Sequence, residues 1–147
     1  MMFRVLNATD VRKHWSEFVD DVIRNKPAFV KRNRDLLAVL SMDQMDALLE
    51  SLKIRINIVQ EEDGSFTGVL NELELAANEE TIDQLKETLI EDLIEYAAEY
   101  MQNFDLYFKS PNRKSHFPYV YKINSMTNTV DRLREEVELY QVVKNNA

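Results

Sequence analysis

The sequence predicts an α+β protein with two unlike domains and a terminal helix. We expect a β-α-β-β-α domain over residues 1–52, a smaller β-β-β-α-β domain over 53–124 and an amphipathic helix over 125–147. The apolar residues indicate this order, because they switch along the chain between helical spacing and strand-like runs. Polar capping residues precede three of the expected helices. Charge separates the parts: residues 1–52 hold eight basic and eight acidic side chains, residues 53–109 four and fourteen, and residues 110–147 six and four.

The first domain opens with a short strand and a capped helix. Phe3 and Val5 lie in the expected strand, and Asn7 is the expected N-cap, with Asp10 three positions further on. The spacing predicts that Trp15 lies in the core and that the helix ends before Pro27. The apolar face of this helix consists of Val11, Trp15, Phe18, Val19, Val22 and Ile23.

A hairpin and a second helix complete this domain. Two strand-like runs, Ala28–Lys31 and Leu36–Leu40, flank a polar turn at Arg32–Asp35. Ser41 and Gln44 match a capping box, in which each side chain bonds the other's backbone at a helix start. The apolar face of this second helix consists of Met45, Leu48, Leu49 and Leu52.

After residue 53 the pattern becomes rich in strands. Isoleucines alternate with other residues from Ile54 to Val59, and a turn at Glu61–Ser65 contains Asp63 and Gly64. The further expected strands are Phe66–Leu70, Leu73–Ala77 and Phe117–Ile123.

Two helices are expected in the same region. Thr81 and Gln84 match a capping box that opens a long helix to about Asn103, with acidic residues opposite its apolar face. The C-terminal helix has a heptad-like seam, which either folds back on its own domain or binds a partner. That seam consists of Met126, Val130, Leu133, Val137 and Tyr140.

The composition excludes several classes of protein. Apolar residues make up 45% of the chain, enough for a packed core. No run approaches the roughly 20 apolar residues that span a bilayer, and no signal-peptide segment follows the start. The absence of cysteine excludes disulfides and thiolate zinc sites, and two glycines are too few for a glycine-rich phosphate loop. We therefore expect a cytoplasmic protein with no membrane contact, cofactor or metal.

The basic residues of the first domain are candidates for binding an anion. Arg12 and Lys13 lie early in the first helix, near its positive dipole end, and Arg32 and Arg34 lie at the hairpin tip. On a symmetric pair of domains these cations would double and could straddle a DNA groove. The alternative is that they are ordinary solvated surface charges.

The first third of the chain resembles the Phd/YefM family of antitoxins. The matching stretches are Asn7–Lys13, Phe18–Asp20, Val30–Asn33, Ala38–Met42 and the Met45–Leu49 helix. The resemblance implies a homodimer, or a higher homo-oligomer, that binds operator DNA and represses its own operon. It places DNA contact at Arg12 and Arg32, and we add Lys13, Arg34, Asn7 and Thr9 to the predicted contacts.

Two positions depart from this family. Arg34 stands where the family usually has glycine, which leaves the geometry of the hairpin turn open. Leu36 stands where the family commonly has proline.

The acidic second half resembles a HicB-like domain, a degenerate RNase H-like arrangement of three strands, a helix and a strand. The resemblance rests on the Glu61–Gly64 turn and the Thr81–Gln84 helix start. A generic α+β interaction domain is the alternative.

Together these features predict an antitoxin that represses its own operon and binds a cognate toxin, expected to be a basic ribonuclease. A stand-alone DNA-binding regulator or interaction module is one alternative. A metal-dependent nuclease that uses Glu72 and Glu74 is another, although solvated acids are the simpler interpretation. His14 is expected at the surface or in an interface, and the aromatic residues between Tyr96 and Tyr121 are expected in a core or a partner groove.

Overall fold

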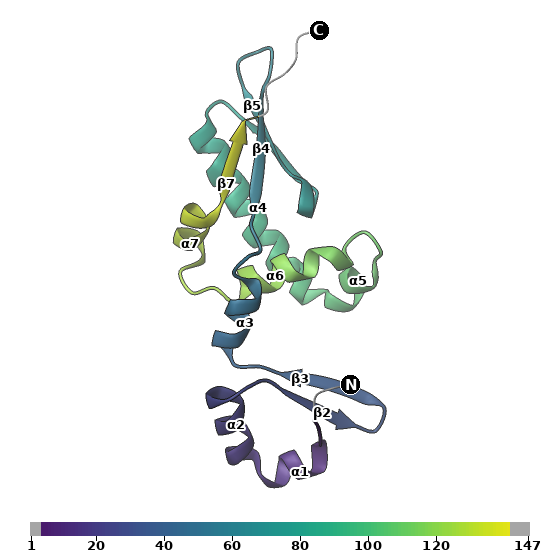
Figure 1. Ribbon diagram of the computed structural model, residues 1–147. Helices are drawn as coiled ribbons and strands as arrows, with labels where there is room; N and C mark the ends of the chain where they lie inside the picture. The colour runs from purple at the N-terminus through teal and green to yellow at the C-terminus, as the bar shows by residue number, and fades with distance from the viewer. Residues whose placement is uncertain (1–3, 142–147) are drawn as a thin grey trace. The chain divides into compact units, whose positions relative to one another are not determined.

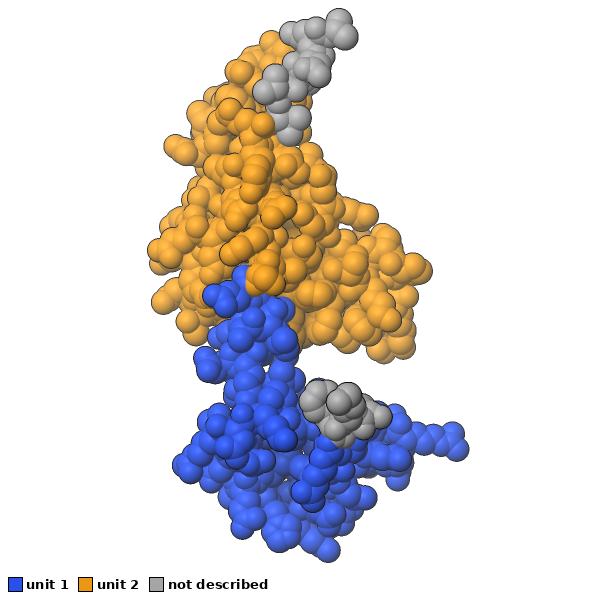
Figure 2. Space-filling view, viewed as in Figure 1, with its two compact units in different colours: residues 1–50 blue, residues 51–147 orange. Residues whose placement is uncertain are grey.

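Two separate sheets organise the computed structural model, which describes residues 4–141 (Figure 1). The chain divides into two compact units, residues 1–50 and residues 51–147 (Figure 2). Each unit holds one sheet, and the described residues form seven α-helices in all. The predicted α+β class is confirmed.

Unit 1, residues 1–50, carries a three-stranded sheet in the order β1-β2-β3. Strand β1 runs parallel to β2, with Asn7 opposite Lys31, and β2 runs antiparallel to β3, with Val30 opposite Leu37. Phe3, which we expected in the first strand, lies outside the described residues. The elements of unit 1 are β1 (Val5–Asn7), α1 (Ala8–Lys13), α2 (Trp15–Arg24), β2 (Ala28–Arg32), β3 (Asp35–Val39) and α3 (Met42–Leu49).

Both predicted caps of unit 1 are present. The Asn7 side chain accepts a hydrogen bond of 2.9 Å from the backbone N–H of Thr9. Ser41 and Gln44 form the reciprocal capping box, and the Gln44 side-chain amide also donates to the carbonyl of Val22 at 2.8 Å. This last bond ties α3 to α2.

The first helix is broken at His14. This residue has a ψ of 41°, outside the helical range, so α1 ends before it and α2 begins after it. Val11 on α1 and Val19 on α2 still pack on the same small core of Phe18, Val22 and Val30. The prediction that Trp15 lies in this core is wrong, because its side chain is 59% exposed, with its ring centre 5.7 Å from that of Phe18.

Unit 2, residues 51–147, carries a four-stranded sheet in the order β6-β5-β4-β7. Helix α4 lies across one face of this sheet (Figure 1). A single cluster of buried side chains, including Ile56, Leu85, Leu89 and Leu133, fills the space between them. The elements of unit 2 are β4 (Arg55–Gln60), β5 (Phe66–Leu70), β6 (Leu75–Glu79), α4 (Ile82–Gln102), α5 (Phe104–Lys109), α6 (Phe117–Asn124), α7 (Thr129–Glu136) and β7 (Glu138–Gln141), with short 3₁₀ turns η1 (Asn71–Leu73) and η2 (Lys114–His116).

The strands at β4 and β5 and the long helix α4 agree with the prediction. The third strand begins two residues later than expected, because η1 and a left-handed Glu74 (φ 55°) precede it. At the start of α4 the Thr81 hydroxyl accepts from the Gln84 N–H, which is one half of the expected capping box.

The strand predicted at Phe117–Ile123 is wrong, because these residues form helix α6. Pro118 stands in the first turn of α6, a position where its missing N–H costs nothing. Val120 and Ile123, three residues apart, are both buried in the core that α4 shares. A short apolar run is ambiguous in sequence, and here packing on α4 selects the helix.

The helix predicted over 125–147 is confirmed only at Thr129–Glu136, because residues 125–128 and 137–141 are not helical and residues 142–147 lie outside the described residues. Helix α7 packs on α4 through the fully buried Leu133, and the Val137 N–H makes its last helical bond. Glu138–Gln141 then forms β7, which pairs in parallel with β4 so that Leu139 lies opposite Ile56. The heptad-like seam is therefore divided between a helix and a strand, with Tyr140 45% exposed.

Candidate nucleic-acid interface

All six residues predicted to contact DNA are exposed on unit 1. The four cations among them form no ion pair with any residue in the range 4–141. Their positive charges are therefore available to an anion outside the chain. The six residues are Asn7, Thr9, Arg12, Lys13, Arg32 and Arg34.

The sheet brings part of this set together. Because β1 and β2 are parallel and Asn7 pairs with Lys31, the start of α1 and the start of the hairpin turn lie at the same end of the sheet. Asn7 and Thr9 therefore lie near the end of β2, where Lys31 and Arg32 add two exposed cations. The sequence could not supply this register, because it joins residues 24 positions apart.

The dipole argument for Arg12 and Lys13 does not hold. Both residues lie in the last turn of the six-residue α1, so they are at its C-terminal end. Cations at a helix C-terminus stabilise the helix, but backbone N–H groups do not gather there for a phosphate. Any contact between Arg12 and DNA must therefore come from its own guanidinium group.

The hairpin turn accommodates Arg34 without a glycine. Asn33 takes the left-handed backbone, with φ of 54°, and Arg34 keeps a negative φ. Asparagine tolerates this conformation better than other residues with a Cβ atom. The turn places Arg32 opposite Asp35 and leaves the Arg34 side chain exposed.

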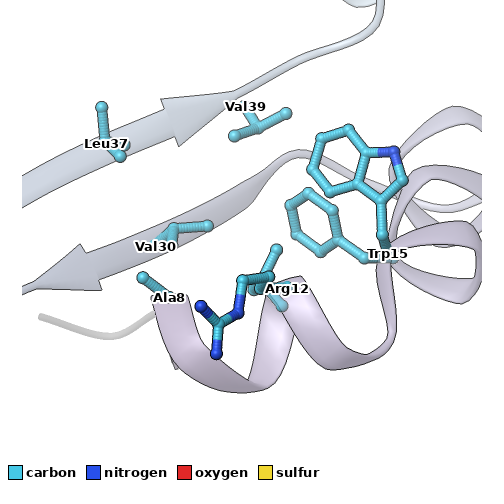
Figure 3. Close-up of a pocket in the computed structure, with 8 residues that line it drawn as sticks. Ala8, Arg12, Trp15, Val30, Leu37 and Val39 are labelled. Atoms are coloured by element: carbon cyan, nitrogen blue, oxygen red, sulfur yellow. The ribbon is translucent and has the colours of Figure 1, made fainter.

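Beside Arg12 lies an apolar hollow of about 350 Å³, which we call the unit 1 groove (Figure 3). Arg12 and Trp15 line its helix side, and Leu37 and Val39 line the side formed by β3. The residues that line the groove are Ala8, Val11, Arg12, Trp15, Phe18, Val30, Leu37 and Val39. Among these described residues, Arg12 is thus the one charged group on an otherwise apolar wall.

Unit 2 carries a second charged feature, an acidic row along α4. Carboxylates recur every four residues, at Asp83, Glu87, Glu91, Glu95 and Glu99. Arg134 neutralises Glu87 through two hydrogen bonds of 2.8 and 3.0 Å, which lower the pKa of Glu87. Asp83, Glu91 and Glu95 have no ion-pair partner among the described residues. The four-residue spacing is visible in the sequence, from which we predicted only that acids lie opposite the apolar face.

The aromatic residues between Tyr96 and Tyr121 pack on one another, as expected for a core. Tyr100 is fully buried and stacks on Tyr107, with ring centroids 5.3 Å apart. The Arg113 guanidinium lies 4.5 Å from the centre of the Tyr107 ring, and the Tyr100 hydroxyl donates to the Arg113 carbonyl. His116 is also buried here, with its Nδ1 2.6 Å from the Tyr96 hydroxyl.

The nuclease alternative named Glu72 and Glu74. Glu72 lies in η1, and Glu74 follows it with a left-handed backbone. Within residues 4–141, no three histidine, aspartate or glutamate side chains gather closely enough to hold a metal ion. No helix in that range is both long and apolar enough to cross a membrane.

The fold and the exposed cations suit a regulatory protein that acts by binding. Comparison with known proteins identifies the family to which it belongs. The sequence profile of the PHD-like family, described as the antitoxin of a toxin–antitoxin RelE/RelB system, matches residues 1–139. The chain belongs to this family, and it is an antitoxin whose partner is a cognate toxin.

A crystal structure from Syntrophomonas wolfei subsp. wolfei agrees with this assignment. It is described as the antitoxin part of a proposed toxin/antitoxin system. The two chains share 36% sequence identity and superpose with a TM-score of 0.86, over 95% of this chain and 100% of the other. No curated protein sequence matches the chain.

Proposed function

We propose that this antitoxin binds operator DNA as a homodimer, represses its own operon, and neutralises its toxin by direct binding. Unit 1 contacts DNA through Arg12 and Arg32, supported by Lys13, Arg34, Asn7 and Thr9. The toxin is a basic ribonuclease held by the acidic unit 2. In the cell the protein acts in the cytoplasm.

One observation carries the DNA proposal: the four predicted cations of unit 1 are exposed and have no ion-pair partner within residues 4–141. Unit 1 has a balanced formal charge, so DNA affinity has to come from local clustering of cations and not from net charge. The register of Asn7 with Lys31 supports such clustering at one end of the sheet. A pair of copies would present two clusters, as two half-sites on DNA require.

We assign the two units to two different antitoxin families. The β-α-β-β-α order of unit 1 supports a Phd/YefM-like domain, with α1 and α2 together standing for its first helix. The order β4-β5-β6-α4 supports a HicB-like domain over residues 53–124, in which the expected last strand at Phe117–Ile123 is replaced by helix α6.

The acidic row supports the proposed toxin surface. Like charges four residues apart on a helix destabilise it by a few tenths of a kcal/mol per pair. A row in which Asp83, Glu91 and Glu95 find no cation among the described residues has such a cost, and a basic partner would remove it. A ribonuclease is basic where it binds RNA, so its active surface is the complementary one.

The DNA proposal is tested with the double variant Arg12→Ala/Arg32→Ala in a gel-shift assay on the DNA upstream of the gene. We expect operator affinity to fall by at least about tenfold, because each lost arginine contact is worth about 1 kcal/mol or more. Thermal unfolding should not change, because both side chains are exposed and form no ion pair within the described range.

The matched control is Arg24→Ala/Lys26→Ala, which removes two exposed cations at the end of α2. It should lower affinity little. Equal affinity of the double variant and the wild type would remove the DNA contact as placed here. The toxin proposal is tested separately, by co-purification of the product of the adjacent gene with the full chain.

A further inference from the structure

Strand β6 forms an unpaired edge of the unit 2 sheet. Among the described residues it is hydrogen-bonded to one strand, β5, with Leu75 opposite Leu70 and Glu79 opposite Phe66. In an edge strand the N–H and C=O groups of alternate residues point away from the neighbouring strand. Such groups of β6 therefore point out of the sheet, where a further strand can pair with them.

The side chains of β6 suit pairing with another strand. Ala76, Ala77 and Asn78 at its centre are small and uncharged. Ala77 packs against the core of unit 2, whereas Ala76 and Asn78 lie on the opposite face of the sheet and are exposed. Lysine, proline and β-bulges are the usual means by which an edge strand avoids pairing, and β6 contains none of them. Its side chains thus leave room for a fifth strand in this four-stranded sheet.

Acidic residues lie at both ends of this edge. Glu74 directly precedes β6, Glu79 is its last residue, and Glu80 follows it. None of these three forms an ion pair with any residue in the range 4–141. The Thr88 hydroxyl on α4 donates to the Glu79 carboxylate at 3.0 Å, so this end of β6 lies beside the helix that carries the acidic row. The edge therefore adjoins the surface proposed to hold the toxin.

These charges disfavour a second copy of the chain as the added strand. In a two-fold antiparallel pair centred on Ala77, Glu74 of one copy would stand opposite Glu80 of the other. Like charges directly opposite each other destabilise a strand pair. A strand that carries lysine or arginine would instead place opposite charges together, so the edge favours a basic partner.

We infer that a strand of the cognate toxin adds to the β6 edge and extends the sheet of unit 2, with basic side chains of the toxin beside Glu74 and Glu80. The inference rests on the proposed function, in which unit 2 holds a basic toxin, and it assigns the strand at which contact is made. Backbone hydrogen bonds supply the affinity of an added strand. The acids at the two ends of β6 supply its preference for a basic strand.

The first test compares two substitutions of the exposed Ala76 in the full chain, with affinity for the product of the adjacent gene measured by titration calorimetry. Ala76→Lys places a cation on the edge, so a basic strand is repelled. Affinity should fall at least about tenfold at low salt, and less at high salt. Ala76→Glu adds a side chain of similar length and opposite charge, and its affinity should stay within about twofold of the wild type.

The control for the position is Ala47→Lys, which makes the same change at an exposed alanine of α3 in unit 1. It should bind the gene product like the wild type. Equal affinity of Ala76→Lys and Ala76→Glu overturns the inference.

The second test needs no substitution, so it holds even if a variant fails to fold. Hydrogen exchange of the wild type is followed amide by amide, with and without the product of the adjacent gene. Amides of β6 that exchange rapidly in the free chain should become protected in the complex, while those of α3 should keep their rates. A complex that forms without protection of β6 overturns the inference and leaves the proposed function standing. If the wild type does not bind the gene product at all, the proposed function fails and the inference fails with it.

Discussion

The hydroxyl of Tyr96 on α4 lies 2.6 Å from Nδ1 of His116 at the end of η2, within hydrogen-bonding distance. His116 is only 3% exposed, and burial lowers its pKa. Glu74 opposes this shift, and Arg113 adds to it. Burial between η2 and α4 thus favours the neutral imidazole of His116.

Unit 2 should lose stability in mild acid because of this histidine. The pKa of His116 is lower in the folded protein than its unfolded value of about 6.5, so the unfolded chain takes up the proton first. Stability is therefore complete above about pH 6.5 and falls as the pH decreases below it. The variant His116→Asn keeps a hydrogen-bond acceptor that cannot be protonated in this range. Denaturant unfolding between about pH 5 and pH 8 should show a flatter profile for the variant, whatever its stability at the upper end.

Wild type and His116→Asn are compared over the same pH range. Equal slopes of stability against pH in the two proteins would mean that the buried imidazole is not the cause.

Gly68 in β5 should tolerate no side chain. A Cβ atom there would lie 2.9 Å from side-chain atoms of Ile56, Leu85 and Leu89, closer than carbon atoms pack. Because these residues join β4 and α4 in a filled core, they have little room to move. Gly68→Ala should lower the free energy of unfolding by about 1 to 3 kcal/mol in urea titrations.

Gly64 gives the matching comparison at a site without crowding. It has a φ of 88° in the exposed turn between β4 and β5, and no atom in the described part of the chain lies within 4 Å of a Cβ built there. The cost of Gly64→Ala is conformational and should be about 1 kcal/mol. A Gly68→Ala variant less affected than Gly64→Ala would mean that α4 does not press on the sheet as described.

Gln44 should contribute more to unit 1 than Ser41, although both belong to one capping box. Ser41→Ala loses the cap hydrogen bond that the Gln44 N–H donates to the Ser41 hydroxyl. Loss of such a cap typically lowers the free energy of unfolding by about 1 kcal/mol. Gln44→Ala loses both its bond from the Ser41 N–H and its bond to the Val22 carbonyl, which holds α3 on α2. Hydrogen exchange of the α3 amides should increase in both variants, and more in Gln44→Ala. Equal effects would show that the bond to Val22 adds nothing.

Features that depend on neighbouring residues could be predicted from the sequence. Asn7 and Ser41 begin helices in the structure as expected, because a cap satisfies backbone N–H groups two or three residues away. The alternation from Ile54 to Val59 likewise identified β4, which is buried on one face. The charges of Arg12 and Arg32 predicted their exposure, since an unpaired cation rarely lies in a core.

Features that depend on distant partners could not be predicted. Residues 138–141 have helical spacing with the residues before them, but β4 offers a free edge about eighty residues earlier, and sheet pairing prevails. The same limit applies to the unit 1 groove, since its lining combines α1, α2, β2 and β3. Trp15 has an apolar ring that suits a core, but it lines this groove and is 59% exposed.

Glu91→Lys should stabilise unit 2 while weakening its proposed contact with toxin. Lysine at position 91 would stand four residues before Glu95, so this repulsion becomes an attraction, whereas Glu87 is already paired with Arg134. The free energy of unfolding should rise by about 0.5 to 1 kcal/mol, and less at high salt. Glu62→Lys makes the same charge change in an exposed turn and should not stabilise a helix. If the adjacent gene's product co-purifies with Glu62→Lys but less with Glu91→Lys, Glu91 contributes to toxin binding while it lowers the stability of α4. Equal recovery with both variants would place the toxin contact elsewhere on the chain.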